Sequence, residues 1–167
     1  MSINFNKKAK VYFSEEFISV SASSLGSLYY FESTFKPIIL DIDCTDEQLG
    51  RAVLSALEHS KQISIDEFSE GFNSGFFKEQ YNKYIDSLMI RFGFKTKKQL
   101  FKKIKEVSIS KIDDKFQLLS THQNSLGSFS ADNNSQTIVV EASTTPATLG
   151  KLTRDAYKEC TSIYDRK

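Results

Sequence analysis

The sequence predicts an α+β fold in which a mostly antiparallel sheet is built from two repeated ββββ-α-like units flanking a helical insert, with the helices packed on the sheet. Short runs of alternating apolar and polar residues lead into an amphipathic helix, and this order occurs twice, about 100 residues apart. The chain has 167 residues, of which 40% are apolar. It is therefore long enough to bury a core, and global disorder is excluded.

The first unit, residues 10–60, is predicted to contain four strands. In the second of them, Ile18 and Val20 alternate with Ser19 and Ser21, which is typical of a half-buried strand. The four strand-type runs are residues 11–13, 17–21, 28–31 and 38–42.

The first unit ends in a helix. Thr45 and Gln48 have the spacing of a capping box, so the helix should begin there and continue to about His59. Its buried stripe is predicted to comprise Leu49, Ala52, Val53, Ala56 and Leu57.

The second unit, residues 107–163, repeats this order. Thr145 is the expected N-cap, and Pro146 occupies the first helical position, where its missing N–H is tolerated. Strands are predicted at 107–112, 116–121, 127–131 and 137–141, and the helix stripe at Leu149, Leu152, Ala156, Cys160 and Ile163.

Residues 61–106 form the helical insert. Ser64 begins a short helix, residues 76–91 form a second one, and Thr96 caps a third. We interpret the whole chain, residues 1–167, as a single domain with an internal duplication; the alternative is a coincidental likeness of two strand–turn–helix units. The matching segments are 24–27 with 125–128, 38–41 with 138–141, and 49–51 with 149–151.

Residues able to carry chemistry are few: His59, His122, the pair Asp41 and Asp43, Cys44 and Cys160. Neither histidine has a partner motif. The two aspartates could face the same way from a strand and hold a divalent cation, but the second unit does not keep the pair. The cysteines follow no metal spacing. We therefore expect no catalytic residue, no metal site and no cofactor.

The formal net charge of +1 gives no general attraction to nucleic acid or to anionic membranes, but the charge is unevenly placed. Residues 41–70 carry eight acids and two bases, whereas residues 95–105 carry six lysines and no acid. Either stretch can be a solvated face. The acidic one could also attract a basic partner, and the lysine-rich one could bind RNA phosphates.

The segment from Ile39 to Gly50, together with the Ser-Leu-Gly-Ser turn at residues 24–27, resembles the CdiI immunity proteins of bacterial contact-dependent growth inhibition. The resemblance implies a small cytoplasmic protein, without catalytic residues, that binds and neutralises the toxin domain of a cognate CdiA effector. Such toxins are often nucleases. No direct nucleic-acid partner and no membrane are expected, and the oligomeric state stays open.

A toxin-binding surface should offer acidic groups to a basic nuclease cleft. The alternatives are a small RNA-binding or RNA-processing protein that uses the basic helix Lys95–Lys105 with His122, or a structural subunit of a larger assembly. The predicted toxin contacts are Asp43, Asp46, Glu47, Asp66, Glu67 and Glu70.

Overall fold

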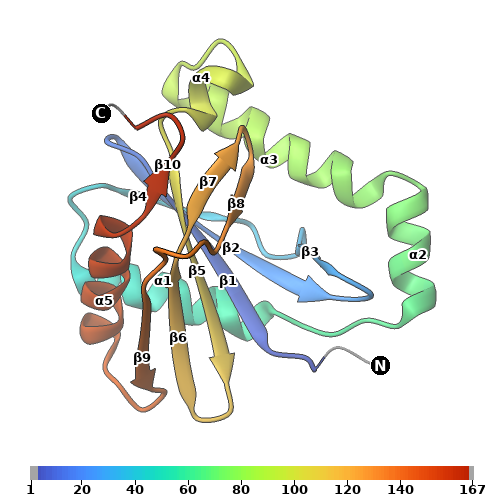
Figure 1. Ribbon diagram of the computed structural model, residues 1–167. Coiled ribbons are helices and arrows are strands. Elements are labelled where there is room, and N and C mark those ends of the chain that lie inside the picture. The colour runs from blue at the N-terminus through green and yellow to red at the C-terminus, as the bar shows by residue number, and fades with distance from the viewer. Residues whose placement is uncertain (1–3, 166–167) are drawn as a thin grey trace.

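The computed structural model describes residues 4–165, which form a seven-stranded sheet, a small three-stranded sheet and five helices (Figure 1). The strands are β1 (Lys7–Phe13), β2 (Phe17–Leu25), β3 (Tyr29–Phe31), β4 (Ile38–Asp41), β5 (Lys105–Ile112), β6 (Lys115–Ser120), β7 (His122–Ser125), β8 (Ser128–Ser130), β9 (Thr137–Glu141) and β10 (Thr161–Ser162). The helices are α1 (Asp46–His59), α2 (Ile65–Asn73), α3 (Phe76–Phe92), α4 (Lys97–Phe101) and α5 (Pro146–Lys158). No helix in this part of the chain combines the length and apolarity that crossing a bilayer requires.

The main sheet joins the two predicted units through their first strands. Its order is β3-β2-β1-β5-β6-β9, with β4 pairing beside β3 on the outer side of β2, and every pairing in it is antiparallel. The central pair places Val11 opposite Val107 and Tyr12 opposite Glu106. The predicted α+β class with a mostly antiparallel sheet is confirmed.

The two units correspond in most elements but differ in the third strand. In the first unit β3 stays in the main sheet, whereas in the second β7 and β8 form a separate sheet with β10. The polar segment His122–Ser125, expected to be a loop, is β7. Strand β7 is fixed in place by buried Gln123. Its side-chain amide donates to the Phe101 carbonyl at 2.8 Å and accepts from the Ser162 hydroxyl at 2.6 Å. The duplication itself stays a prediction.

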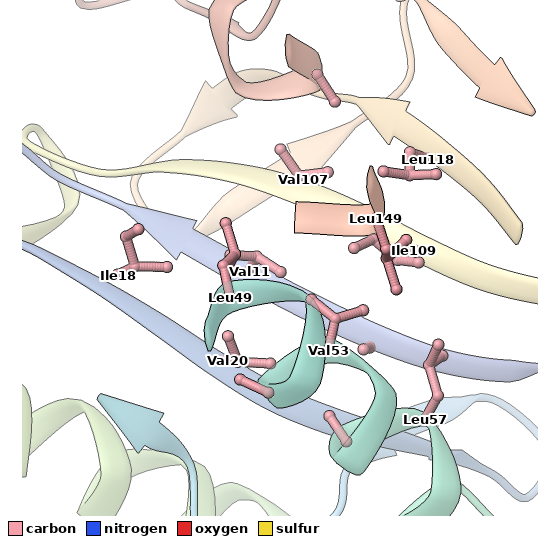
Figure 2. Close-up of a cluster of buried hydrophobic side chains, with 14 of the residues drawn as sticks. Val11, Ile18, Val20, Leu49, Val53, Leu57, Val107, Ile109, Leu118 and Leu149 are labelled. Atoms are coloured by element: carbon pink, nitrogen blue, oxygen red, sulfur yellow. The ribbon is translucent and has the colours of Figure 1, made fainter. Parts of the chain in front are cut away.

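One face of the sheet is covered by α1 and α5, and Figure 2 shows the hydrophobic core between the sheet and these helices. The predicted alternation explains this core, because side chains two positions apart on a strand point to the same face. Val11, Ile18 and Val20 thus point at α1, whose Leu49 and Val53 are fully buried.

The predicted stripe of the last helix holds as far as Cys160 but is wrong at Ile163. Helix α5 ends at Lys158, and the chain then turns into β10. Cys160 remains buried, but Ile163 is 55% exposed because it no longer follows the helical period.

The opposite face of the sheet packs against the insert, so the helices that were predicted to pack on the sheet lie on both of its faces. Tyr84, Ile85 and Leu88 of α3 cluster with Tyr12 and Phe17 of the sheet, on the side away from α1. This covering is partial: α2 stands at the edge of the molecule beyond β3 (Figure 1).

Helices α1 and α5 touch through the two glycines of the repeated Leu-Gly pair. A Cβ built on Gly50 would lie 1.8 Å from the carbonyl oxygen of Pro146, and one built on Gly150 would lie 1.8 Å from that of Asp46. Each helix therefore approaches the first turn of the other at a distance that excludes any side chain.

We predict that Gly50→Ala or Gly150→Ala destabilises the protein by about 1–3 kcal/mol, the usual cost of overpacking. Elsewhere in a helix the same change would stabilise by about 1 kcal/mol. Urea unfolding measures the difference, with Glu58→Ala on the exposed side of α1 as the control. Unchanged or increased stability of both glycine variants would show that the close contact does not exist.

Candidate functional site

A cavity of about 550 Å³ lies between the sheet face opposite α1 and the insert. Its floor is made by β1, β2 and β5, one wall by β3, α2 and α3, and the other wall by β8. The lining residues include Lys10, Tyr12, Ser21, Ser23, Tyr30, Phe31, Phe72, Phe77, Tyr81, Glu106 and Phe129.

The cavity exists because the middle of β2, from Ser19 to Ser23, carries only small side chains on this face. Ser19, Ser21 and Ser23 alternate with the apolar residues that face α1, so the same alternation that builds the core leaves space on the other side. Only part of this space is filled: the Tyr84 hydroxyl reaches Ser19 Oγ at 2.5 Å. Larger β2 side chains would have packed against α3 and closed the cavity.

The floor holds an ionisable cluster centred on Glu106. Its side chain is 4% exposed, and the nearest cation, Lys10 Nζ, lies 3.8 Å from a carboxylate oxygen. Burial raises the pKa of Glu106, and the charges of Lys10 and Lys8 oppose that shift. Tyr12, its cross-strand neighbour, shares a hydrogen bond of 2.8 Å with the Tyr81 hydroxyl of α3.

The walls are aromatic. Tyr30 of β3 stacks on Phe77 of α3 with ring centroids 4.1 Å apart, and Phe31 stacks on Tyr84 at 5.1 Å. Burial raises the pKa of Tyr30 to about 12 and that of Tyr81 to about 12, so both hydroxyls stay protonated and available as donors.

Helix α2, whose Phe68 and Phe72 line the cavity, carries three of the predicted contact residues. Asp66, Glu67 and Glu70 are all exposed, and within residues 4–165 no cation lies within ion-pair distance of them. The charge of Glu67 contributes to the raised pKa of Tyr30 in the cavity wall. The other side of α2 is apolar yet largely uncovered: Ile65 is 70% exposed and the cavity-lining Phe72 is 63% exposed.

The other three predicted contacts lie at the opposite end of α1, a helix about 20 Å long by its 14 residues. Asp46 accepts from Arg154 Nε at 3.0 Å, and Glu47 pairs with Arg51 at 2.7 Å. Asp43 is exposed beside them. The six acids therefore form two separate groups, because α1 stands between them, and Asp46 serves to hold α5 against the loop before α1.

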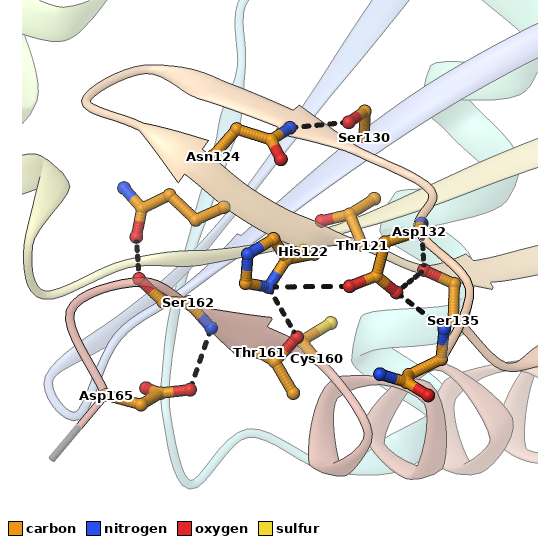
Figure 3. A network of polar contacts seen from close by, with 12 residues as sticks. Thr121, His122, Asn124, Ser130, Asp132, Ser135, Cys160, Thr161, Ser162 and Asp165 are labelled. Carbon is orange, nitrogen blue, oxygen red and sulfur yellow. Dashed lines mark hydrogen bonds and ion pairs between the residues drawn. The ribbon is translucent and has the colours of Figure 1, made fainter. Parts of the chain in front are cut away.

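The basic stretch Lys95–Lys105 does not form a single helix. Helix α4 has only five residues, and Lys105 lies in β5, where it pairs with Asp165 at 3.1 Å. Lys102 lies over the ring of Tyr164. His122 is held in place: its Nδ1 lies 2.8 Å from Thr161 Oγ1 and 3.8 Å from Asp132 Oδ2, as Figure 3 shows.

Both cysteine thiols have a raised pKa. Burial raises the pKa of Cys160 to about 11, so this thiol is a poor nucleophile. Burial also raises the pKa of Cys44, against the opposing charge of Arg154. Across the described residues, no three His, Cys, Asp or Glu side chains are grouped so as to hold a metal ion.

Sequence reasoning missed the cavity and Glu106, and its choice of the acidic residues of α2 as toxin contacts stays a prediction. One signal was present: Ser19, Ser21 and Ser23 follow one another on the polar side of an otherwise apolar strand. The strand containing Glu106 was predicted to begin at Val107, which left this carboxylate outside the sheet, whereas β5 begins at Lys105.

A family model described as CDI immunity protein, CdiI, matches residues 7–160. This chain belongs to the CdiI family. The match includes both units and the insert between them, and so covers every residue of the cavity lining. No curated protein matches the chain in sequence.

Two solved structures share the fold. A protein of unknown function from Neisseria meningitidis superposes with a TM-score of 0.86 at 22% identity, covering 96% of this chain and 99% of that one. A chain of a CdiA-CT/CdiI toxin and immunity complex from Yersinia pseudotuberculosis superposes with a TM-score of 0.83 at 23% identity. The match covers 95% of this chain and 99% of that one. These likenesses confirm the fold of the whole described chain.

We predict that Glu106 makes stability fall with rising pH. Its raised pKa means that the folded state binds the proton more tightly than the unfolded state. The destabilisation therefore develops as pH rises from the ordinary value of 4.5 through the folded pKa. Glu106→Gln should be at least as stable as the wild type at neutral pH and should lose this part of the pH dependence. Chemical unfolding from about pH 4 to about pH 8 tests it, and an unchanged slope would contradict it.

Proposed function

We propose that this chain binds and neutralises the C-terminal toxin domain of a cognate CdiA effector, and that α2 with the mouth of the cavity is the binding surface. Membership of the CDI immunity family supports an inhibitor role. One structural relative comes from a complex of a CdiA toxin domain with its immunity protein, which supports the same kind of partner.

The observation that carries the proposed surface is the composition of α2. Its uncovered Ile65 and Phe72 lie beside carboxylates that have no partner among the described residues. Apolar side chains left exposed next to a cavity are typical of protein–protein contact sites. Unpaired carboxylates around them give the electrostatic complement to a basic partner and speed its association.

We further propose that the toxin is a nuclease and that this chain acts on it in the cytoplasm by covering its substrate-binding surface. A nuclease must present positive charge to phosphates, and the α2 surface offers the opposite sign. In this mechanism the immunity protein needs no catalytic group, because tight association alone excludes the substrate.

Reversing the α2 charges should weaken toxin binding. We expect the triple variant Asp66→Lys, Glu67→Lys, Glu70→Lys to lower the association rate about 10-fold to 100-fold at low salt, because electrostatic steering is lost. Stopped-flow or surface-based kinetics with the C-terminal domain of the CdiA protein encoded beside this chain measures it, and circular dichroism checks folding.

The matched comparison is Asp43→Lys with Glu47→Lys at the far end of α1. If α2 is the surface and both variants are compared at physiological salt, this pair changes the rate about 3-fold or less, since the two groups are separated by about 20 Å, more than twice the Debye length of about 8 Å. A larger effect of the α1 pair than of the α2 triple would place the interface at the N-terminal end of α1.

Neutralisation can be tested with the same toxin domain incubated with RNA or with DNA. We expect this chain alone to leave both intact, the toxin domain to degrade one of them, and an equimolar mixture to leave it intact. Hydrolysis in the mixture at the rate of the free toxin would refute the proposed function, and hydrolysis by this chain alone would refute the binding-only mechanism.

A further inference from the structure

Glu106 is a buried carboxylate with unused capacity to accept hydrogen bonds. It lies in the floor of the cavity with its side chain 4% exposed, yet no side chain of residues 4–165 donates to it within hydrogen-bond range. Its single ion-pair contact is with Lys10 at 3.8 Å. A carboxylate in such surroundings costs free energy unless donors compensate its lost hydration.

Glu32 is a buried carboxylate of the same molecule whose lost hydration is replaced by hydrogen bonds from protein donors. It is equally buried, but it accepts from Ser24 Oγ at 2.8 Å, from the Thr34 amide at 3.1 Å and from the Thr34 hydroxyl at 2.7 Å. These hydrogen bonds lower the pKa of Glu32, whereas burial raises that of Glu106. The fold thus satisfies one buried carboxylate from within and leaves the other facing a cavity.

The surroundings of Glu106 fit a cationic side chain. Tyr12 lies directly across the strand pair, and the ring of Phe129 from β8 lies 5.8 Å from that of Tyr12. Aromatic faces next to a carboxylate are a recurrent setting for ammonium and guanidinium groups. The hydroxyls of Tyr12 and Tyr81 share one hydrogen bond with each other, and within residues 4–165 neither of them donates to Glu106.

Lys8 and Lys10 leave space beside Glu106 for such a cationic side chain. Lys8 Nζ lies over the ring of Tyr29 at 4.2 Å. Lys10 is 41% exposed and makes no hydrogen bond to Glu106, so its flexible side chain can turn to solvent.

We propose that Glu106 receives an arginine or lysine side chain of the bound toxin domain, which enters the cavity past Tyr12 and Phe129. This rests on the proposed function and deepens it: the α2 carboxylates attract the partner, and Glu106 fixes its register. A cationic residue of the toxin then supplies the donors that Glu106 lacks.

The test is Glu106→Gln, which keeps the shape of the side chain and removes its charge. We expect the Kd for the toxin domain encoded beside this chain to rise about 10-fold to 100-fold, because a charge-assisted hydrogen bond is lost at a buried site. Glu159→Gln is the control, since it makes the same change of net charge at an exposed position beyond α5 and should alter the Kd less than about 2-fold.

A double-mutant cycle identifies the partner residue. Each lysine and arginine of the toxin domain is changed to Met in turn, and we expect one of these changes to be non-additive with Glu106→Gln while the rest are additive. Glu106→Asp, which keeps the charge but withdraws it by one methylene, provides a second measurement and should also weaken binding.

The possible results distinguish a failure of the proposed function from a failure of the role proposed for Glu106. If wild-type protein does not bind the toxin domain, the proposed function fails and this inference with it. If it binds while Glu106→Gln binds as tightly, the inference alone is overturned. Tighter binding by Glu106→Gln also overturns it, since the cavity would then receive an anionic group next to Lys10.

Discussion

The close contact of α1 with α5 is the constraint on which the rest of the molecule depends. Each helix places a glycine against the first-turn carbonyl of the other, and this contact holds both helices on one face of the sheet. Arg154 strengthens the arrangement: it donates to the carbonyls of Ile42 and Cys44 and to Asp46, and so attaches α5 to the loop that leads into α1. With both helices on one side, the insert is left to cover the other.

The sheet face toward the insert differs from the face toward α1 and α5 because the two sides of the same strands pack against different elements. Toward α1 and α5 these strands present close-packed apolar side chains, whereas toward the insert the middle of β2 presents serines and β5 presents Glu106. An apolar surface in that position would have packed against α3 and filled the space. The cavity is therefore a consequence of strand alternation combined with small residues, and its aromatic walls are supplied by β3 and α3.

Charge is distributed around this cavity in two layers. In the proposed mechanism the exposed carboxylates of α2 act over a distance, so their effect is on the association rate and depends on salt. In the proposed mechanism Glu106, which is almost fully buried, acts only on direct contact and therefore affects how long a bound partner stays. A chain with a net charge of +1 can carry this acidic surface because α2 contains no lysine or arginine, while several lysines lie in and around α4.

Short-range patterns in the amino-acid sequence determined most of the fold. Alternation in β2, the capping box of Thr45 with Gln48 and the repeated Leu-Gly pair are short-range signals, and the structure confirms the strand, the cap and the helix that they predict. Local signals could not show that β7 pairs with β10, since the hydrogen bonds of Gln123 come from residues 22 and 39 positions away in sequence. The candidate site was decided by the tertiary structure alone: α1 separates acids that look continuous along the chain, and the pairing of β1 with β5 brings Glu106 beside Tyr12, 94 positions apart. Burial and charge at such a place depend on neighbours that meet only when the sheet has formed.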